Sequence, residues 1–180
     1  IRPEEIPNID LYMDQVTTFM DDHYSSTKRY SDDKILTKTM INNYTKNNLL
    51  PPSVKKKYSR EHMLLLILIY YFKNILSIKD IETVLQPLRE KYFSGNNAVQ
   101  LSDIYKEVCE MEKSRIDPMK ASVKEAYEKS QSAFADMPEG EDQDELKLFA
   151  FICSLSFDVY LKKMMIEKII DELAAKEKEE

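Results

Sequence analysis

Apolar residues recur three and four positions apart along nearly the whole chain, which is the spacing of one face of an α-helix. Strict alternation of apolar and polar residues, typical of strands, is nearly missing. The pattern predicts helices over residues 9–22, 37–48, 59–76, 77–85, 87–93, 102–111, 119–134 and 144–176. We therefore predict an all-α fold with at most a small two-stranded wing, which would lie in the short cationic segment 53–59.

Residues that favour helix ends support several of these boundaries. Thr37, Ser59, Ser77 and Ser102 each stand where a side-chain oxygen can accept a hydrogen bond from the first turn of a helix. Pro118 follows an aspartate and suits a helix start or a kink. These residues predict short helices separated by defined turns in the first half of the chain, and a break near residue 118.

The last predicted helix, residues 144–176, has two interpretations. Its apolar residues at alternating spacings of three and four form a heptad seam, broken by Lys162, which is typical of a coiled-coil dimer. The seam consists of Leu148, Ile152, Leu155, Val159, Ile166, Ile169 and Leu173. Further apolar residues, among them Phe149, Phe157 and Tyr160, widen this face as expected for a helix buried inside a bundle. The two interpretations are compatible, and both stay open.

Charge is distributed unevenly along the chain. The formal net charge of -6 divides into -5 for residues 1–33, +7 for residues 34–60 and -8 for residues 61–180. The middle stretch of 27 residues contains no Asp or Glu. An acidic protein with one purely cationic segment is expected to use that segment against an anionic partner.

Composition excludes several classes of function. The chain has 2 glycines, whereas phosphate-binding loops of nucleotide enzymes need several close together. The longest apolar run, residues 63–72, is half the ~20 residues that cross a membrane. Cys109 and Cys153 lie apart from each other and from any Cys/His cluster, which predicts buried free thiols and a cytoplasmic location. We expect no enzyme activity, no cofactor and no metal site, and for His62, at the start of an apolar helix, a surface or capping role.

The segment 36–81 carries a resemblance to a known family. It reads LTKTMINNYTKNNLLPP and then, after two residues, KKKYSREHMLLLILIYYFKNILSIKDI. This resembles the MerR-type winged helix-turn-helix, in which a short recognition helix leads into an LLPP turn, a basic wing ending in Tyr and a Ser-capped apolar helix. The phrases IDLYMDQVTTFMDD, LTKTMINNY and KKKYSREH also resemble a bacterial family of unknown function.

The resemblance implies a domain organisation and departs from the MerR pattern at named positions. It implies a DNA-binding region over residues 1–95 and a helical bundle for dimerisation or sensing over residues 96–180. Asn42, Asn43 and Tyr44 stand where MerR proteins have Arg-Tyr-Tyr, and Asn48 stands at their turn glycine. Lys57 and the tyrosine after it match the wing Arg-Tyr. A long loop separates the first helix from the recognition helix, so the operator geometry of MerR proteins does not carry over.

The residues themselves indicate how DNA would be contacted. The start of the recognition helix would meet base edges and phosphates, the two adjacent asparagines can pair with adenine, and the basic residues would contact phosphates. The predicted DNA-binding residues are Thr37, Lys38, Thr39, Asn42, Asn43, Lys46, Lys55, Lys56, Lys57, Tyr58 and Arg60. Neutralising about 4 to 6 phosphates per protomer predicts a slope of about -4 to -5 for log K against log salt.

These observations lead to two hypotheses. The first is a cytoplasmic transcriptional regulator that binds double-stranded DNA and dimerises through its C-terminal helices, with a small-molecule effector suggested by analogy alone. The second is a protein-interaction module whose basic loop binds an acidic protein, with no role for DNA. The two differ in whether residues 38–46 are exposed together with residues 55–57.

Overall fold

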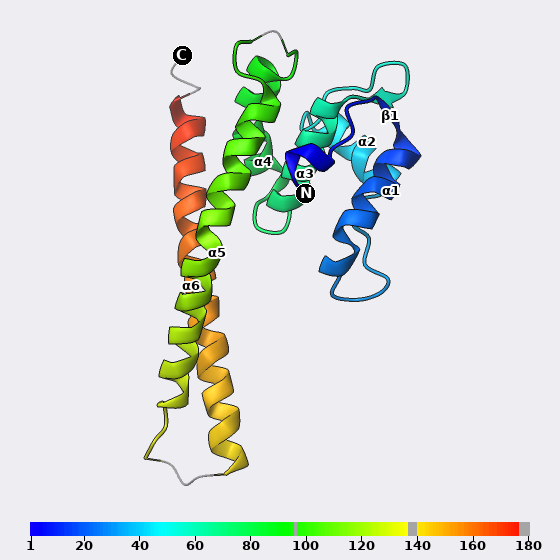
Figure 1. Ribbon diagram of the computed structural model, residues 1–180. Coiled ribbons are helices and arrows are strands. Elements are labelled where there is room, and N and C mark those ends of the chain that lie inside the picture. The colour runs from blue at the N-terminus through cyan, green and yellow to red at the C-terminus, as the bar shows by residue number, and fades with distance from the viewer. Residues whose placement is uncertain (96, 137–139, 177–180) are drawn as a thin grey trace. The chain divides into compact units, whose positions relative to one another are not determined.

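The computed structural model describes residues 1–95, 97–136 and 140–176, and within them the chain is mainly helical with one small antiparallel sheet (Figure 1). The predicted all-α fold with a small two-stranded sheet is therefore confirmed. The helix predicted from residue 9 was wrong at its start, because it begins at Met13 and residues 11–12 instead form a strand that pairs with residues 57–58. In chain order the elements are η1 (Pro3–Glu5), β1 (Leu11–Tyr12), α1 (Met13–Tyr24), η2 (Ser25–Thr27), α2 (Lys38–Lys46), β2 (Lys57–Tyr58), α3 (Arg60–Phe72), α4 (Ile78–Pro87), η3 (Leu88–Tyr92), α5 (Leu101–Gln131) and α6 (Glu141–Lys176).

The chain forms two compact units. Unit 1 contains Ile1–Cys109 together with the residues from Leu173 on, and unit 2 contains Glu110–Glu172. The division falls inside α5, 14 residues beyond the predicted boundary at 95/96. Leu101 and Tyr105 explain this position, because both are buried and the Tyr105 hydroxyl donates a hydrogen bond to the carbonyl of Ile1 at 2.6 Å. The beginning of α5 thus belongs to unit 1.

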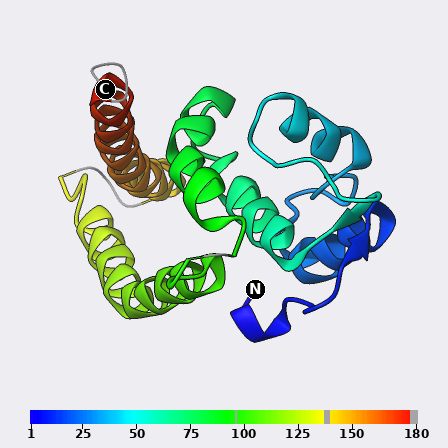
Figure 2. The same ribbon diagram turned by 90° about the horizontal axis from the view of Figure 1, so that it is seen from above.

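Helix α3 forms the centre of unit 1. Residues 62–69 are all buried, so this helix is covered on every side. Side chains of the neighbouring helices complete the core, among them Val16 and Met20 of α1, Ile41 of α2 and Ile81 of α4. Figure 2 shows α3 lying between α4 on one side and α1 and α2 on the other. The strand β2 leads directly into α3 and pairs with β1, with Leu11 opposite Tyr58 and Tyr12 opposite Lys57.

Most of the predicted helix ends are found in the structure. The Thr37 side chain accepts a hydrogen bond from the backbone N–H of Met40, and the Ser77 side chain accepts one from Asp80. Ser59 is the N-cap of α3. The prediction for Ser102 was wrong: α5 begins one residue earlier, where the Asp103 carboxylate accepts a hydrogen bond from the N–H of Gln100.

Unit 2 is a helical hairpin, in which α5 and α6 run in opposite directions (Figure 1). The rings of Tyr127 and Phe151 meet edge to face with their centroids 5.4 Å apart and join the two helices. A helix start at Pro118 was wrong, because α5 continues through this residue. Cys153 is exposed on α6 rather than buried, and Cys109 is half-buried; both are free thiols.

Replacing Pro118 by Ala should stabilise the hairpin. A proline inside a helix lacks the N–H that would bond to the carbonyl of Ser114, and its ring presses on that carbonyl. We expect P118A to raise the free energy of unfolding by up to about 3 kcal/mol in urea denaturation followed by circular dichroism. S114A, one turn away, should change it by less than about 0.5 kcal/mol. An unchanged or lower stability of P118A would contradict this reading of α5.

Candidate nucleic-acid interface

One face of α2 is exposed and carries the residues that the sequence predicted for base and phosphate contacts. Residues on the same face of a helix are three or four positions apart. The exposed residues of this face are Lys38, Thr39, Asn42, Asn43 and Lys46. Ile41 and Tyr44 lie on the opposite side of α2 and are buried in the core of unit 1. Helix α2 is therefore seated by its apolar side and presents a polar, cationic side to solvent.

The end of α2 is defined by a left-handed residue. Asn48 has φ 55°, and the N–H groups of Leu49 and Leu50 donate to the carbonyl of Tyr44 at 2.9 and 3.3 Å. Asparagine tolerates this conformation better than most other non-glycine residues. Leu49 and Leu50 are fully buried and fix the turn that follows. The orientation of α2 is thus anchored at both its apolar face and its C-terminus.

The wing is a two-residue turn between Val54 and Lys57. Their backbones exchange hydrogen bonds of 3.1 and 2.9 Å, and Lys55 and Lys56, between them, have φ 51° and 63°. Positive φ at both central residues is the feature of a type I′ turn, which normally takes Asn-Gly. Both lysines are exposed. The left-handed conformation costs a residue with a β-carbon roughly 1–2 kcal/mol. Both lysines therefore occupy a backbone conformation that is unfavourable for them.

The base of the wing is built from an aromatic and a cationic residue. Lys57 is half-buried, and its Nζ lies 5.3 Å from the ring centroid of Tyr12 on the paired strand. Tyr58 is 4% exposed and contacts the ring of His62 edge to face at 5.4 Å. Tyr58 therefore anchors the wing from inside and does not belong to the exposed surface.

Arg60 also differs from the surface phosphate contact that the sequence predicted. It is half-buried, and its guanidinium donates a hydrogen bond of 2.8 Å to the backbone carbonyl of Pro3. The guanidinium thus ties the N-terminal segment to the beginning of α3. The exposed cations among the predicted DNA-binding residues are accordingly the two lysines of α2 and the two lysines of the wing turn. Within the described residues none of these four forms an ion pair.

His62 connects the turn after α2 with the wing and α3. Its Nδ1 accepts a hydrogen bond of 3.0 Å from the backbone N–H of Ser59, which is a capping interaction at the start of α3. The other ring nitrogen, Nε2, lies 3.3 Å from the carbonyl oxygen of Pro52 and donates to it. The ring of Phe93 packs against the imidazole edge to face at 4.8 Å. The capping role predicted for His62 is confirmed, whereas a surface position is wrong, because the side chain is 2% exposed.

Burial holds the pKa of His62 below its usual value near 6.5. The hydrogen bond to Pro52 and the carboxylate of Glu61 act in the opposite direction, and they are weaker than the loss of solvation. The imidazole is therefore neutral near pH 7, as its two hydrogen bonds require, since one nitrogen accepts and the other donates.

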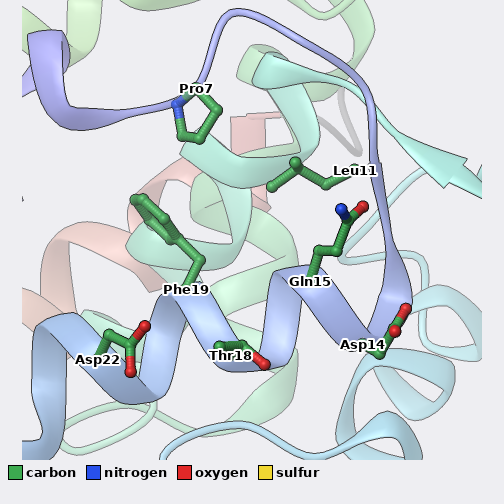
Figure 3. Close-up of a pocket in the computed structure, with 7 residues that line it drawn as sticks. All are labelled: Pro7, Leu11, Asp14, Gln15, Thr18, Phe19 and Asp22. Atoms are coloured by element: carbon green, nitrogen blue, oxygen red, sulfur yellow. The ribbon is translucent and has the colours of Figure 1, made fainter.

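A separate groove lies beside α1 (Figure 3). Its volume is about 340 Å³, and it is lined by Pro7, Leu11, Asp14, Gln15, Thr18, Phe19 and Asp22. Figure 3 shows Phe19 pointing from α1 toward Pro7 in the N-terminal segment. Two carboxylates and no basic residue appear among the described residues that line it. Such a groove repels phosphate and is distinct from the cationic surface.

The described residues offer neither a metal site nor a membrane-spanning helix. Residues 1–95, 97–136 and 140–176 contain no group of three or more His, Cys, Asp or Glu side chains placed to hold a metal ion. In the same ranges, none of the helices has the length and apolar character needed to cross a membrane.

Sequence reasoning missed the residues that support the interface from behind. The link from Arg60 to Pro3 spans 57 positions, and the contact between His62 and Phe93 spans a turn and two helices. The one local signal was the Ser59-x-x-His62 spacing, which matches a capping box with an imidazole in place of a carboxylate.

The neutral state of His62 makes unit 1 sensitive to acid. Because its pKa is lower in the folded than in the unfolded chain, the unfolded chain binds more protons, and stability falls as the pH drops below about 6.5. We expect the free energy of urea unfolding to decline between pH 7 and 5, and H62Q to lose part of this pH dependence. H23Q is the matched control, since His23 is exposed, and should retain the slope. An unchanged slope in H62Q would exclude His62 as its source.

Comparison with known proteins places the region just described in a family. Residues 1–108 match the family described as "Domain of unknown function (DUF1836)". This match ends within one residue of the main segment of unit 1, so the family region and the compact unit coincide. No curated protein and no solved structure matches the chain. Since the match covers more than half of the 180 residues, the chain belongs to the DUF1836 family.

Proposed function

We propose that unit 1 is a double-stranded DNA-binding module, in which α2 reads the major groove and the wing turn contacts the phosphate backbone. The observation that carries this proposal is the exposed face of α2, where Asn42 and Asn43 lie between Lys38 and Lys46 while the apolar side is buried. Side chains of this length on a helix face can form paired hydrogen bonds with adenine. Lysines at either end of the same face suit the phosphates that border the groove.

The order of the elements supports the MerR-like interpretation. Strand β1, α1, α2, the wing turn, β2 and α3 follow one another, and α2 packs on α1 as the second helix of a helix-turn-helix does. The connection between α1 and α2 is the main departure, because residues 25–37 take the place of a short turn. This connection is held down by Lys73, whose ammonium donates a 3.0 Å hydrogen bond to the carbonyl of Ile35.

Electrostatics favour a DNA surface confined to α2 and the wing. Four exposed lysines lack ion-pair partners within the described residues, while the groove beside α1 carries two aspartates. At physiological salt the Debye length is about 8 Å, so the acidic regions act only on phosphates near them. They weaken non-specific contact through other faces and leave the cationic face free. In this proposal the protein is a cytoplasmic transcriptional regulator.

Binding should depend on salt and on the lysines of the wing. We expect selection from genomic fragments at two salt concentrations to enrich a common sequence, and log K to fall against log salt with a slope of about -4. K55A/K56A should reduce the magnitude of that slope by about 2. K113A/K120A, which removes the same charge from α5, should leave it unchanged.

Two further outcomes decide the proposal. N42A/N43A should lose about 1–3 kcal/mol of discrimination between sites and keep the salt slope, because asparagines read bases and carry no charge. If the wild-type protein retained no DNA at low salt and captured an acidic protein in stoichiometric amount, the interaction-module hypothesis would replace this one.

The wing turn offers a variant in which stability and binding move in opposite directions. K55N/K56G replaces two left-handed lysines by the residues that a type I′ turn prefers, and we expect it to raise the free energy of unfolding by about 2 kcal/mol. It should weaken DNA binding as much as K55A/K56A, whose stability should stay within about 1 kcal/mol of wild type. Chemical denaturation and fluorescence anisotropy measure the two effects. Unimpaired binding by K55N/K56G would remove the wing lysines from the interface.

A further inference from the structure

Helix α6 carries a row of large apolar side chains that its hairpin partner α5 leaves uncovered. Six of the seven residues of the predicted heptad seam are exposed, and Leu155 alone is half-buried. The exposed fractions are Leu148 58%, Ile152 52%, Val159 64%, Ile166 37%, Ile169 56% and Leu173 46%. Exposure of so many apolar side chains to water is unfavourable, which indicates that this surface is covered in the functional state.

The hairpin packs mainly beside the seam. The apolar residues of the first half of α6 that are less exposed are Leu146, Ala150, Phe151 and Leu155, and only Leu155 belongs to the seam. Phe151 meets Tyr127 of α5, whereas its neighbour Ile152 stays half exposed. Successive residues of a helix point in directions about 100° apart, so the contact with α5 and most of the seam occupy different sides. The two interpretations of α6 thus apply to different sides of one helix.

The uncovered area is sufficient for a stable interface. The seam is flanked by Phe149, Tyr160 and Met165, which are 61%, 58% and 66% exposed. An aromatic side chain can bury about 150–250 Å². With side-chain areas of this order and the exposed fractions above, the seam residues and these three neighbours together expose on the order of 800 Å². A standard interface between two proteins buries about 800 Å² per partner.

Charge and side-chain branching indicate which partner fits. Residues 146–172 contain four basic and four acidic residues, so neither an anionic membrane nor nucleic acid is attracted and a second copy is not repelled. Ile152, Val159 and Ile166 are seven positions apart and β-branched, and Leu148 and Leu155 occupy the alternating positions. This combination, which holds over residues 148–166 and is reversed at Ile169 and Leu173, favours two-stranded coiled coils.

We propose that α6 pairs with α6 of a second copy along this seam, with Lys162 at its centre. A single Asn or Lys at an a position of a two-stranded coiled coil sets the register at a cost in stability, and Lys162, at the alternating d position, is expected to carry the same cost. Lys162 is exposed and interrupts the seam at the one heptad position without an apolar side chain. The proposal rests on α6 and does not require unit 1 to bind DNA.

The test is sedimentation equilibrium of the full chain without nucleic acid. The wild-type protein should be a dimer, and V159E should raise the dimer Kd by about 100-fold or more, because each dimer would bury two carboxylates. The matched control is F157E: Phe157 is 59% exposed on the same helix but lies two positions off the seam. F157E should change the Kd by less than about 3-fold.

A loss of association in V159E could also result from impaired folding, so a second variant is designed to associate more tightly than the wild-type protein. K162L completes the seam and should lower the dimer Kd by about tenfold or more. A wild-type protein that stayed monomeric at all concentrations would overturn the proposal. So would equal effects of F157E and V159E, or association with neutral lipid vesicles in place of self-association. DNA binding by V159E, measured separately, reports on unit 1 alone.

Discussion

Helix α3 needs apolar neighbours on every side, and the arrangement of unit 1 follows from this requirement. Residues 63–69 are seven consecutive large apolar side chains, and all are buried. At about 1.5–3 kcal/mol for each buried side chain, they contribute on the order of 10–20 kcal/mol as an upper estimate. This is several times the roughly 2–4 kcal/mol that two left-handed lysines cost in the wing.

His62 contacts the start of α3, the turn after α2 and the wing, and so links α3 to the candidate interface. The first turn of α3 would otherwise leave a backbone N–H of Ser59 unpaired next to the core, and the imidazole satisfies it. The same ring donates to Pro52 in the turn that ends α2. One neutral side chain thus connects the start of the buried helix, the turn after α2 and the wing tyrosine, and keeps α2 and the wing in a constant relation to α3. Pre-positioning of this kind reduces the entropy that binding must otherwise overcome.

Much of unit 1 was predictable because its signals are local. Thr37, Asn48 and Ser77 act within three or four residues of themselves, and the chemistry of caps and left-handed turns is the same in every protein. The exposed side of α2 was predictable for the same reason, since Ile41 and Tyr44 define the buried side. The bond from Arg60 to Pro3 and the packing of Phe93 on His62 were not predictable, because these partners are distant in sequence; only the capping role of His62 had a local signal. Composition identified a cation and an imidazole and gave no information on which backbone each would meet.

Hydrophobic patterning predicts that both α3 and α6 are covered, but it does not predict which helices cover them. Both helices are apolar beyond a single stripe, and the same rule predicts that each is surrounded. Unit 1 meets this requirement for α3 within one chain, because α1, α2 and α4 are near it in sequence and wrap around it. Unit 2 supplies α6 with one long neighbour, α5, and two helices cannot cover an apolar surface that extends around one of them. Periodicity reports that a face must be covered and does not report how many chains cover it. Heptad spacing with β-branched residues at Ile152, Val159 and Ile166 adds the missing information, because it specifies a helix of matching spacing, and a second α6 has that spacing.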